Sequence, residues 1–207
     1  GGHTVSIVST GAVTDSAADG DTTADILADA ITIATGTAAF GKVANTIEFD
    51  YLASNGLTVT NAGGLHILTD DDLTLQGAID VSSGASDKSI SLIISKADGV
   101  FDQGDFALTG AAASGTILIA ADRVTLATTA SRTSALNVVL RPFDTAETIG
   151  LSGGAGDFAL SAAELAALTE ANVDSLVIGN VGGTGTTTIN ATTFLNSVST
   201  TGGGDQV

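Results

Sequence analysis

Three short runs, Leu57-Thr58-Val59, Leu65-His66-Ile67-Leu68 and Leu73-Thr74-Leu75, follow one another within 19 residues. In each run apolar side chains alternate with small or polar ones, which is the period of two typical of a β-strand with one buried face. Glycine, asparagine and aspartate separate the runs, as they do at turns. This stretch predicts short strands that lie close together and share one apolar side.

Runs of the same form recur along most of the chain. They are residues 5–8, 31–33, 47–51, 90–94, 106–108, 117–119, 124–126, 136–140, 149–151, 158–160 and 176–178. The pattern predicts an all-β protein. The close spacing of the runs fits an antiparallel sandwich or barrel, and it also fits a solenoid whose coils each hold two or three short strands.

The turns and the repeated side-chain types favour the solenoid. Hairpin-type dipeptides are few, namely Asp19-Gly20, Asn55-Gly56 and Asp98-Gly99, whereas a meander needs many. The inward positions are Leu, Ile and Val throughout, as expected when stacked coils place like residues over like. We therefore expect a right-handed parallel β-helix of roughly 7–9 coils, each of about 22–30 residues.

One helix is expected within this β pattern, near residues 161–168. Ser161-Ala162-Ala163-Glu164 has the S-x-x-E form of a capping box, in which Ser161 and Glu164 bond each other's backbone N–H. Leu165 and Leu168 then fall on one face, and Asn172 is the expected stop. Residues 23–30 are a weaker helical candidate that fits an extra strand equally well.

Composition excludes several classes of protein. The 207 residues contain 6 Lys+Arg and 23 Asp+Glu, for a formal net charge of −17, so the basic face that binds nucleic acid or anionic lipid is absent. No cysteine is present for disulfides or thiolate zinc sites. No apolar run reaches the ~18 residues that a membrane helix needs.

The first residues, Gly1-Gly2-His3, include no methionine and no signal peptide, and Thr201-Gly202-Gly203-Gly204 is typical of a linker. We therefore expect one β-helix domain over residues 1–200, as a segment of a longer chain, and a Gly-rich tail over 201–207.

A family resemblance is visible over residues 136–195. The motifs that carry it are Arg141-Pro142-Phe143, Ile149-Gly150-Leu151, the run from Phe158 to Leu165, the run from Asp174 to Gly179 and the Gly/Thr stretch that ends at Ile189. This order resembles the unit of filamentous-haemagglutinin-like exoproteins and other very large bacterial β-strand-repeat adhesins. In that unit an RPF entry and a strand precede an LSxAEL helical turn, an LxIG strand and a further strand.

The resemblance implies a right-handed parallel β-helix in a secreted, surface-associated giant protein, with no catalytic residues in these coils. Ala163 stands where an acidic residue is common in the family. The expected function is therefore a non-catalytic structural segment for adhesion or for extracellular filament or matrix formation. The expected partners are further copies or neighbouring coils, and glycans or proteins at a host or cell surface, with no nucleic acid and no membrane insertion.

Acidic clusters are the candidate metal ligands. Asp19, Asp21 and Asp25 surround one tight turn, and Asp70, Asp71 and Asp72 form a second cluster. Ca²⁺ binds several oxygen ligands on such turns, although neither cluster has the full spacing of an EF-hand. The sequence is more typical of solvated aspartates that cap turns. Weakly bound calcium is thus the one cofactor considered, and a calcium-dependent assembly module is one alternative function.

Carbohydrate chemistry is the other alternative, because β-helices often host polysaccharide-cleaving or tailspike-like depolymerase sites. Such a site needs paired carboxylates with a cation or histidine beside them. His66 lies near Asp70–Asp72 in sequence, but the chain has few cations and no aromatic pair nearby to stack on a sugar. The sequence predicts that His66 is a surface residue and assigns no catalytic group.

Overall fold

A computed structural model of the chain describes residues 3–16, 23–85, 87–168, 172–191 and 197–201. The elements in chain order are β1 (Thr4–Val8), β2 (Ile26–Ala34), β3 (Ala39–Phe40), β4 (Ile47–Asn61), β5 (Gly64–Thr69), β6 (Leu73–Leu75), β7 (Ile79–Asp80), β8 (Ile90–Ile94), β9 (Val100–Asp102), β10 (Leu108–Thr109), β11 (Thr116–Ala120), β12 (Arg123–Thr125), β13 (Thr133–Arg141), β14 (Ile149–Leu151), β15 (Phe158–Leu160), α1 (Ala162–Ala167), β16 (Val173–Gly179), β17 (Thr187–Ile189) and β18 (Ser197–Thr201).

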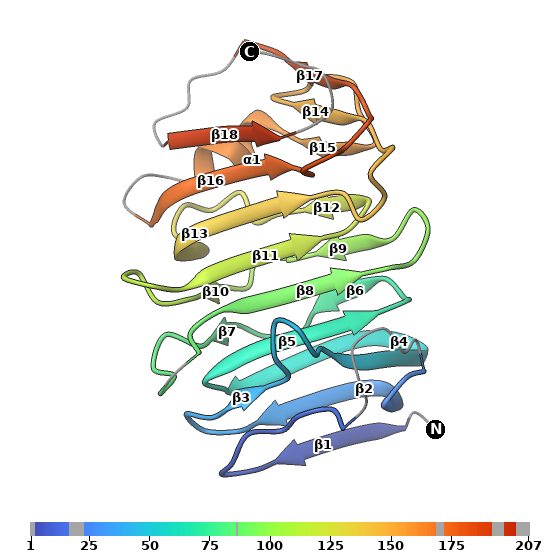
Figure 1. The fold of residues 1–207 in the computed structure, drawn as a ribbon, viewed down its shortest axis with the longest axis vertical. Helices are drawn as coiled ribbons and strands as arrows, with labels where there is room; N and C mark the ends of the chain where they lie inside the picture. The colour runs from blue at the N-terminus through green and yellow to red at the C-terminus, as the bar shows by residue number, and fades with distance from the viewer. Residues whose placement is uncertain (1–2, 17–22, 86, 169–171, 192–196, 202–207) are drawn as a thin grey trace.

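These strands wind into a right-handed parallel β-helix, as the sequence predicts (Figure 1). One side of the stack, face A, consists of the first halves of β2 and β4 followed by β5, β8, β11, β13, β16 and β18. Each pairs in parallel with the next, so eight coils are stacked on this face. Face B consists of β1, the second halves of β2 and β4, then β6, β9 and β12, and finally β15, β14 and β17.

The interior is built from aliphatic ladders that run from coil to coil. On face A, Ile67, Leu92, Ile119, Leu140 and Ile178 lie directly over one another. All five side chains are fully buried. Stacked coils place like residues over like at one strand spacing, which explains why the inward positions are so uniform in the sequence.

One coil is longer than the others because it holds an insertion. Leu92 and Ile119 are 27 residues apart and Ile119 and Leu140 are 21 apart, whereas Leu140 and Ile178 are 38 apart. The extra residues form β14, β15 and α1, and β14 pairs in parallel with β15 after only a short loop. A Cβ on Gly150 of β14 would lie 2.2 Å from the carbonyl oxygen of Gly154 in this loop, so position 150 needs glycine.

The helix forms where the capping box predicts it. The Ser161 hydroxyl accepts from the Glu164 N–H at 3.2 Å, and Glu164 Oε2 accepts from the Ser161 N–H at 2.8 Å. Glu164 also reaches the preceding coil, because its Oε1 accepts from the Leu126 N–H at 2.7 Å. Leu165 and Leu168 are buried as expected. The helix ends at Ala167, earlier than the expected stop at Asn172, because Leu168 leaves helical geometry with ψ 70°.

Other differences from the sequence-based expectation are local. Residues 26–30, within the weak helical candidate, belong to strand β2, so the strand alternative is confirmed there. Phe106 and Ala107 precede β10 rather than belong to it. The two- and three-residue strands β3, β7 and β9 carry too little periodicity to be found from sequence. No helix among the described residues is both long and apolar enough to cross a membrane.

Candidate functional site

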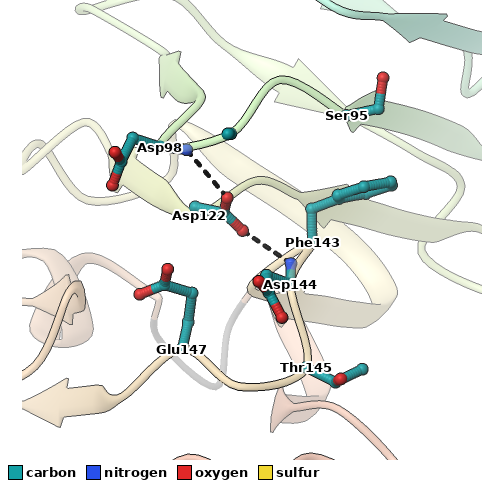
Figure 2. Close-up of a pocket in the computed structure, with 8 residues that line it drawn as sticks. Ser95, Asp98, Asp122, Phe143, Asp144, Thr145 and Glu147 are labelled. Carbon is teal, nitrogen blue, oxygen red and sulfur yellow. Dashed lines mark hydrogen bonds between the residues drawn. The ribbon is translucent and has the colours of Figure 1, made fainter.

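One hollow lies on the turns that follow β8, β11 and β13. It has a volume of about 440 Å³ and is lined by Ser95, Ala97, Asp98, Asp122, Phe143, Asp144, Thr145 and Glu147. Figure 2 shows the carboxylates of Asp98, Asp122, Asp144 and Glu147 around it, with the Phe143 ring at one side. The hollow is therefore acidic, with one exposed aromatic ring.

The Asp122 side chain connects the turns that surround this hollow. The residue is 2% exposed, and its two carboxylate oxygens accept from the Asp98 N–H at 3.1 Å and from the Asp144 N–H at 2.7 Å (Figure 2). The turns of the two coils on either side of Asp122 are thus bonded to one side chain. Because both oxygens already accept backbone N–H groups, Asp122 acts as a coil-to-coil brace.

Glu147 and Asp157 are electrostatically linked beside the same hollow. Burial raises the pKa of Glu147, and the charges of Asp157, Asp122 and Asp98 raise it further. A hydrogen bond from the Thr148 hydroxyl lowers the pKa of Asp157, and the bond with Glu147 lowers it further. Arg123 supplies a nearby cation, but it pairs with Asp98 at 2.9 Å in an exposed position, where such pairs contribute little.

Two carboxylate triads come together elsewhere in the stack. Asp15, Asp25 and Glu48 place one oxygen each within 4.8 Å of one another, and so do Asp50, Asp70 and Asp71. Asp25, Asp70 and Asp71 are three of the six aspartates that the sequence indicates as candidate ligands. Glu48 and Asp50 lie about one coil away from these residues in the chain, and Asp15 lies ten residues before Asp25, so only the register of the coils reveals the grouping.

The remaining sequence candidates do not join a triad. The Asp72 carboxylate bonds Lys96 Nζ at 2.7 Å and accepts the Val100 N–H at 2.9 Å. The hydrogen bond from Lys96 and the backbone bond together lower the pKa of Asp72 although burial alone would raise it. Asp72 is thus another link between successive coils. Asp19 and Asp21 lie outside the described residues.

The triad at Asp50 is partly exposed and is bonded to the backbone of a buried tyrosine. Burial raises the pKa of Asp50, and the charges of Asp70 and Asp71 add to that shift. Asp71 Oδ2 accepts the Tyr51 N–H at 2.8 Å. The Tyr51 side chain packs edge-on against Phe49 in the core, and burial raises the pKa of its phenol. Tyr51 thus serves the core rather than the triad.

The triad at Glu48 is the more buried of the two. Glu48 is 8% exposed, and burial together with its hydrogen bond and charge repulsion with Asp25 raises its pKa to about 7. The Thr46 hydroxyl donates to Glu48 Oε1 at 3.2 Å and partly offsets the shift. The Glu48 carboxyl, with its pKa raised to about 7, therefore changes its protonation state near neutral pH.

This shift predicts a pH dependence of stability. Between about pH 4.5 and 7 the folded chain keeps a proton on Glu48 that the unfolded chain has lost, so this contribution to stability falls as the pH rises. As the pH is raised from 5 to 8, the free energy of unfolding of Glu48→Gln should increase by about 1–3 kcal/mol relative to that of the parent chain. Urea unfolding at a series of pH values measures the difference, and a difference that stays flat with pH contradicts the assignment.

His66 differs most from its sequence-based prediction. It projects from β5 on the side opposite Leu65 and Ile67, as its place between two apolar residues suggests, but it is 0% exposed instead of lying at the surface. Its Nε2 lies 2.5 Å from Asp87 Oδ2, and no described group bonds Nδ1. A buried N–H without an acceptor costs more than a buried ring nitrogen without a donor. The pair is therefore best satisfied when Nε2 carries the proton and faces Asp87.

Loops from neighbouring coils cover His66 and leave a small hollow beside it. The hollow has a volume of about 340 Å³ and is lined mainly by small residues of the loops around β3, together with Lys42, Ala85 and Asp87. Asp87 thus connects the buried histidine to the surface. Among the described residues, the side-chain partner of His66 is Asp87, and no hydroxyl is bonded to its ring.

Comparison of the chain with protein-family models, with curated proteins and with solved structures finds no match.

Proposed function

We propose that the chain is a non-catalytic structural segment of a large secreted bacterial surface protein, serving in adhesion or in extracellular filament or matrix formation. The observation that carries this proposal is the uninterrupted interior. The ladder through Ile67, Leu92, Ile119, Leu140 and Ile178 is continuous in register and fully buried over most of the stack. A rod with such an interior holds distant surfaces at a set separation.

The buried polar side chains support the same role. Asp122 joins the turns at Asp98 and Asp144, and Glu164 joins α1 to the end of β12 at Leu126. Gln103 Nε2 donates to the carbonyl of Phe106 at 2.9 Å. Most of these groups saturate backbone donors or acceptors of an adjacent turn or coil, which leaves few of their atoms for chemistry on a substrate.

The location and the role are tested on intact cells that produce the parent protein. Brief protease treatment of the cells should release peptides of this chain before any cytosolic marker appears. In-frame deletion of the segment should reduce attachment of the cells to a surface or to one another. Peptides found only after lysis, or unchanged attachment, would overturn the proposal. Cleavage of acidic polysaccharides by the purified chain, lost on Asp70→Asn or Asp71→Asn, would instead support the carbohydrate-active alternative.

A calcium-dependent assembly module is the second candidate, and the triad of Asp15, Asp25 and Glu48 favours it. Three converging carboxylate oxygens are a suitable partial ligand set for Ca²⁺, which completes its shell with water or carbonyl groups. Ca²⁺ binding would also displace the proton that burial and Asp25 hold on Glu48 near neutral pH. Binding is therefore expected to strengthen from pH 6 to pH 8.

We predict that 1 mM CaCl₂ at pH 8 stabilises the chain by about 1–3 kcal/mol, as expected for a site with a Kd of roughly 10–100 μM. Thermal unfolding after EDTA treatment, with and without added Ca²⁺, measures this. Asp25→Asn should abolish the shift, whereas Asp105→Asn, an exposed acid outside both triads, should preserve it. An unchanged melting temperature with Ca²⁺ contradicts this alternative.

A further inference from the structure

The outer surface of face A carries aliphatic side chains from β8 to β16. Leu118 of β11, Val139 of β13 and Val177 of β16 lie directly over one another in register. Each alternates with fully buried neighbours and is itself only partly buried, so its side chain points away from the interior. Ile93 of β8 has the same outward setting beside β11. These four residues form the outer patch of the rod.

No element of the described chain covers the outer patch. In Figure 1 face A is turned toward the viewer, and no strand or helix lies in front of β8, β11, β13 and β16. The column of Leu118 continues through Ser91 to His66 on β5, and at that position loops of other coils do cover the sheet. A contiguous apolar area that is left open to solvent is typical of a surface that binds a partner.

The strands under the outer patch also lack the acid that dominates the rest of the chain. β8 (ISLII), β11 (TILIA) and β13 (TSALNVVLR) contain no Asp or Glu, and β16 (VDSLVIG) contains Asp174 alone. The whole chain carries a net charge of −17, so two copies repel each other over most of their surfaces. Face A is where a second copy approaches with the least repulsion.

One cation and one acid stand at opposite ends of the outer patch. Arg141 ends β13, and its Nη1 donates to the neutral Asn180 Oδ1 at 3.2 Å. Asp174 is exposed near the start of β16. Within the described part of the chain, neither residue forms a salt bridge. Because β13 and β16 are parallel, the positive charge lies where the strands end and the negative charge where they begin.

This arrangement is complementary to itself under one rotation. A two-fold axis parallel to the rod places face A of a second copy against face A of the first, each strand over its own counterpart with the direction reversed. Leu118, Val139 and Val177 of both copies then meet at the centre. The same rotation brings Arg141 of each copy over the Asp174 end of the other. Sheets that pack face to face lie about 10 Å apart, a gap that these side chains span together.

We propose that two copies of this chain dock side by side through their outer patches, as a two-fold symmetric dimer. The contact uses the same surface on both copies, so it closes at two and does not propagate. The outer patch spans only four strands about 4.8 Å apart, which is small for a protein interface, so a weak dimer is expected, with a Kd of about 10–500 μM. The proposal deepens the structural role and rests on it, but the two fail separately, because a segment that stays monomeric can still act as a rod.

Sedimentation velocity up to about 1 mM chain tests the pairing, in 0.15 M NaCl, which screens the repulsion between copies beyond about 8 Å. The parent should pass from monomer to dimer and form nothing larger. Val139→Asp and Val177→Asp each place a charge at the centre of the contact and should weaken the dimer at least about tenfold. Thr125→Asp is the matched control, because it adds the same charge at an exposed position of β12 on face B and should dimerise as the parent does.

Charge reversal tests the orientation of the two copies. Asp174→Lys and Arg141→Glu should each weaken the dimer about fivefold or more, because each brings like charges together at two symmetric positions. The double variant restores opposite charges and should recover most of the parent's affinity. A change that merely disturbs a strand would not be rescued by the second reversal.

Circular dichroism checks that every variant keeps the β fold, and should one valine variant unfold, the other still has to lose the dimer. A parent chain that stays monomeric would overturn the proposal, and so would growth beyond dimers. The proposal is equally wrong if a folded Val139→Asp chain dimerises like the parent, or if the double charge variant pairs no better than the single ones.

Discussion

Ile119→Ala is expected to lower the free energy of unfolding by about 2–5 kcal/mol, the range for an aliphatic side chain removed from a packed interior. Ile119 is 0% exposed and lies between Leu92 and Leu140 in the face A ladder. The parallel backbone hydrogen bonds fix the spacing of the coils, so the chains above and below cannot collapse into the space. The cost should therefore fall in the upper part of this range.

Leu118→Ala on the same strand is the matched control, because Leu118 faces outward and is only partly buried. It should cost no more than about 1 kcal/mol. Urea unfolding followed by circular dichroism measures both variants. Equal losses for Ile119→Ala and Leu118→Ala would contradict the assignment of the inward face.

Gly63→Ala is expected to destabilise the chain by about 3 kcal/mol or more, by overpacking at a site where only backbone is near. A Cβ at this position would lie 1.9 Å from the Thr37 carbonyl oxygen, and backbone cannot rotate away as a side chain does. The Gly63 N–H also donates to the Ala38 carbonyl at 2.8 Å. Relief of the clash therefore requires the loop at residues 35–38 to move.

This movement should also expose the buried histidine. The Thr37 carbonyl accepts from the Ala85 N–H, so the loop before Asp87 is bonded to the same segment. We expect His66 to become reactive to diethylpyrocarbonate in Gly63→Ala, whereas it should be protected in the parent chain. Gly11→Ala, where a Cβ would meet nothing within 4 Å, should leave both stability and protection unchanged. Protection retained in Gly63→Ala would contradict this account of the loops.

The net charge of −17 first suggests an external cationic partner. The structure places much of it in other roles, since Asp72, Asp87 and Asp122 bond groups of adjacent coils, and other aspartates cap their own turns. Asp80, for example, accepts from the Ser82 N–H two residues later at 2.9 Å. Acidity in this chain therefore both terminates turns and ties coils together, and the unpaired remainder favours solubility.

The sequence by itself determined the fold class, most strands and the helix. Alternation of apolar residues and the capping box of Ser161 and Glu164 are local signals, since they depend only on neighbours along the chain. The sequence also predicts the parallel solenoid, because the turn residues and the uniform inward residues favour stacked coils over hairpins. The same local signals located Asp25, Asp70 and Asp71 as acidic turn residues.

Only the tertiary structure determines which residues of other coils those side chains contact. The register between coils, set by side chains packed across the interior, brings Glu48 to Asp25 and Asp50 to Asp71. It also buries His66 beneath loops from two other coils and brings Glu164 to Leu126, 38 residues away. Coil lengths vary from about 20 to 38 residues, so no fixed period in the sequence encodes these contacts between coils. They depend on long-range backbone pairing, which a local pattern does not specify.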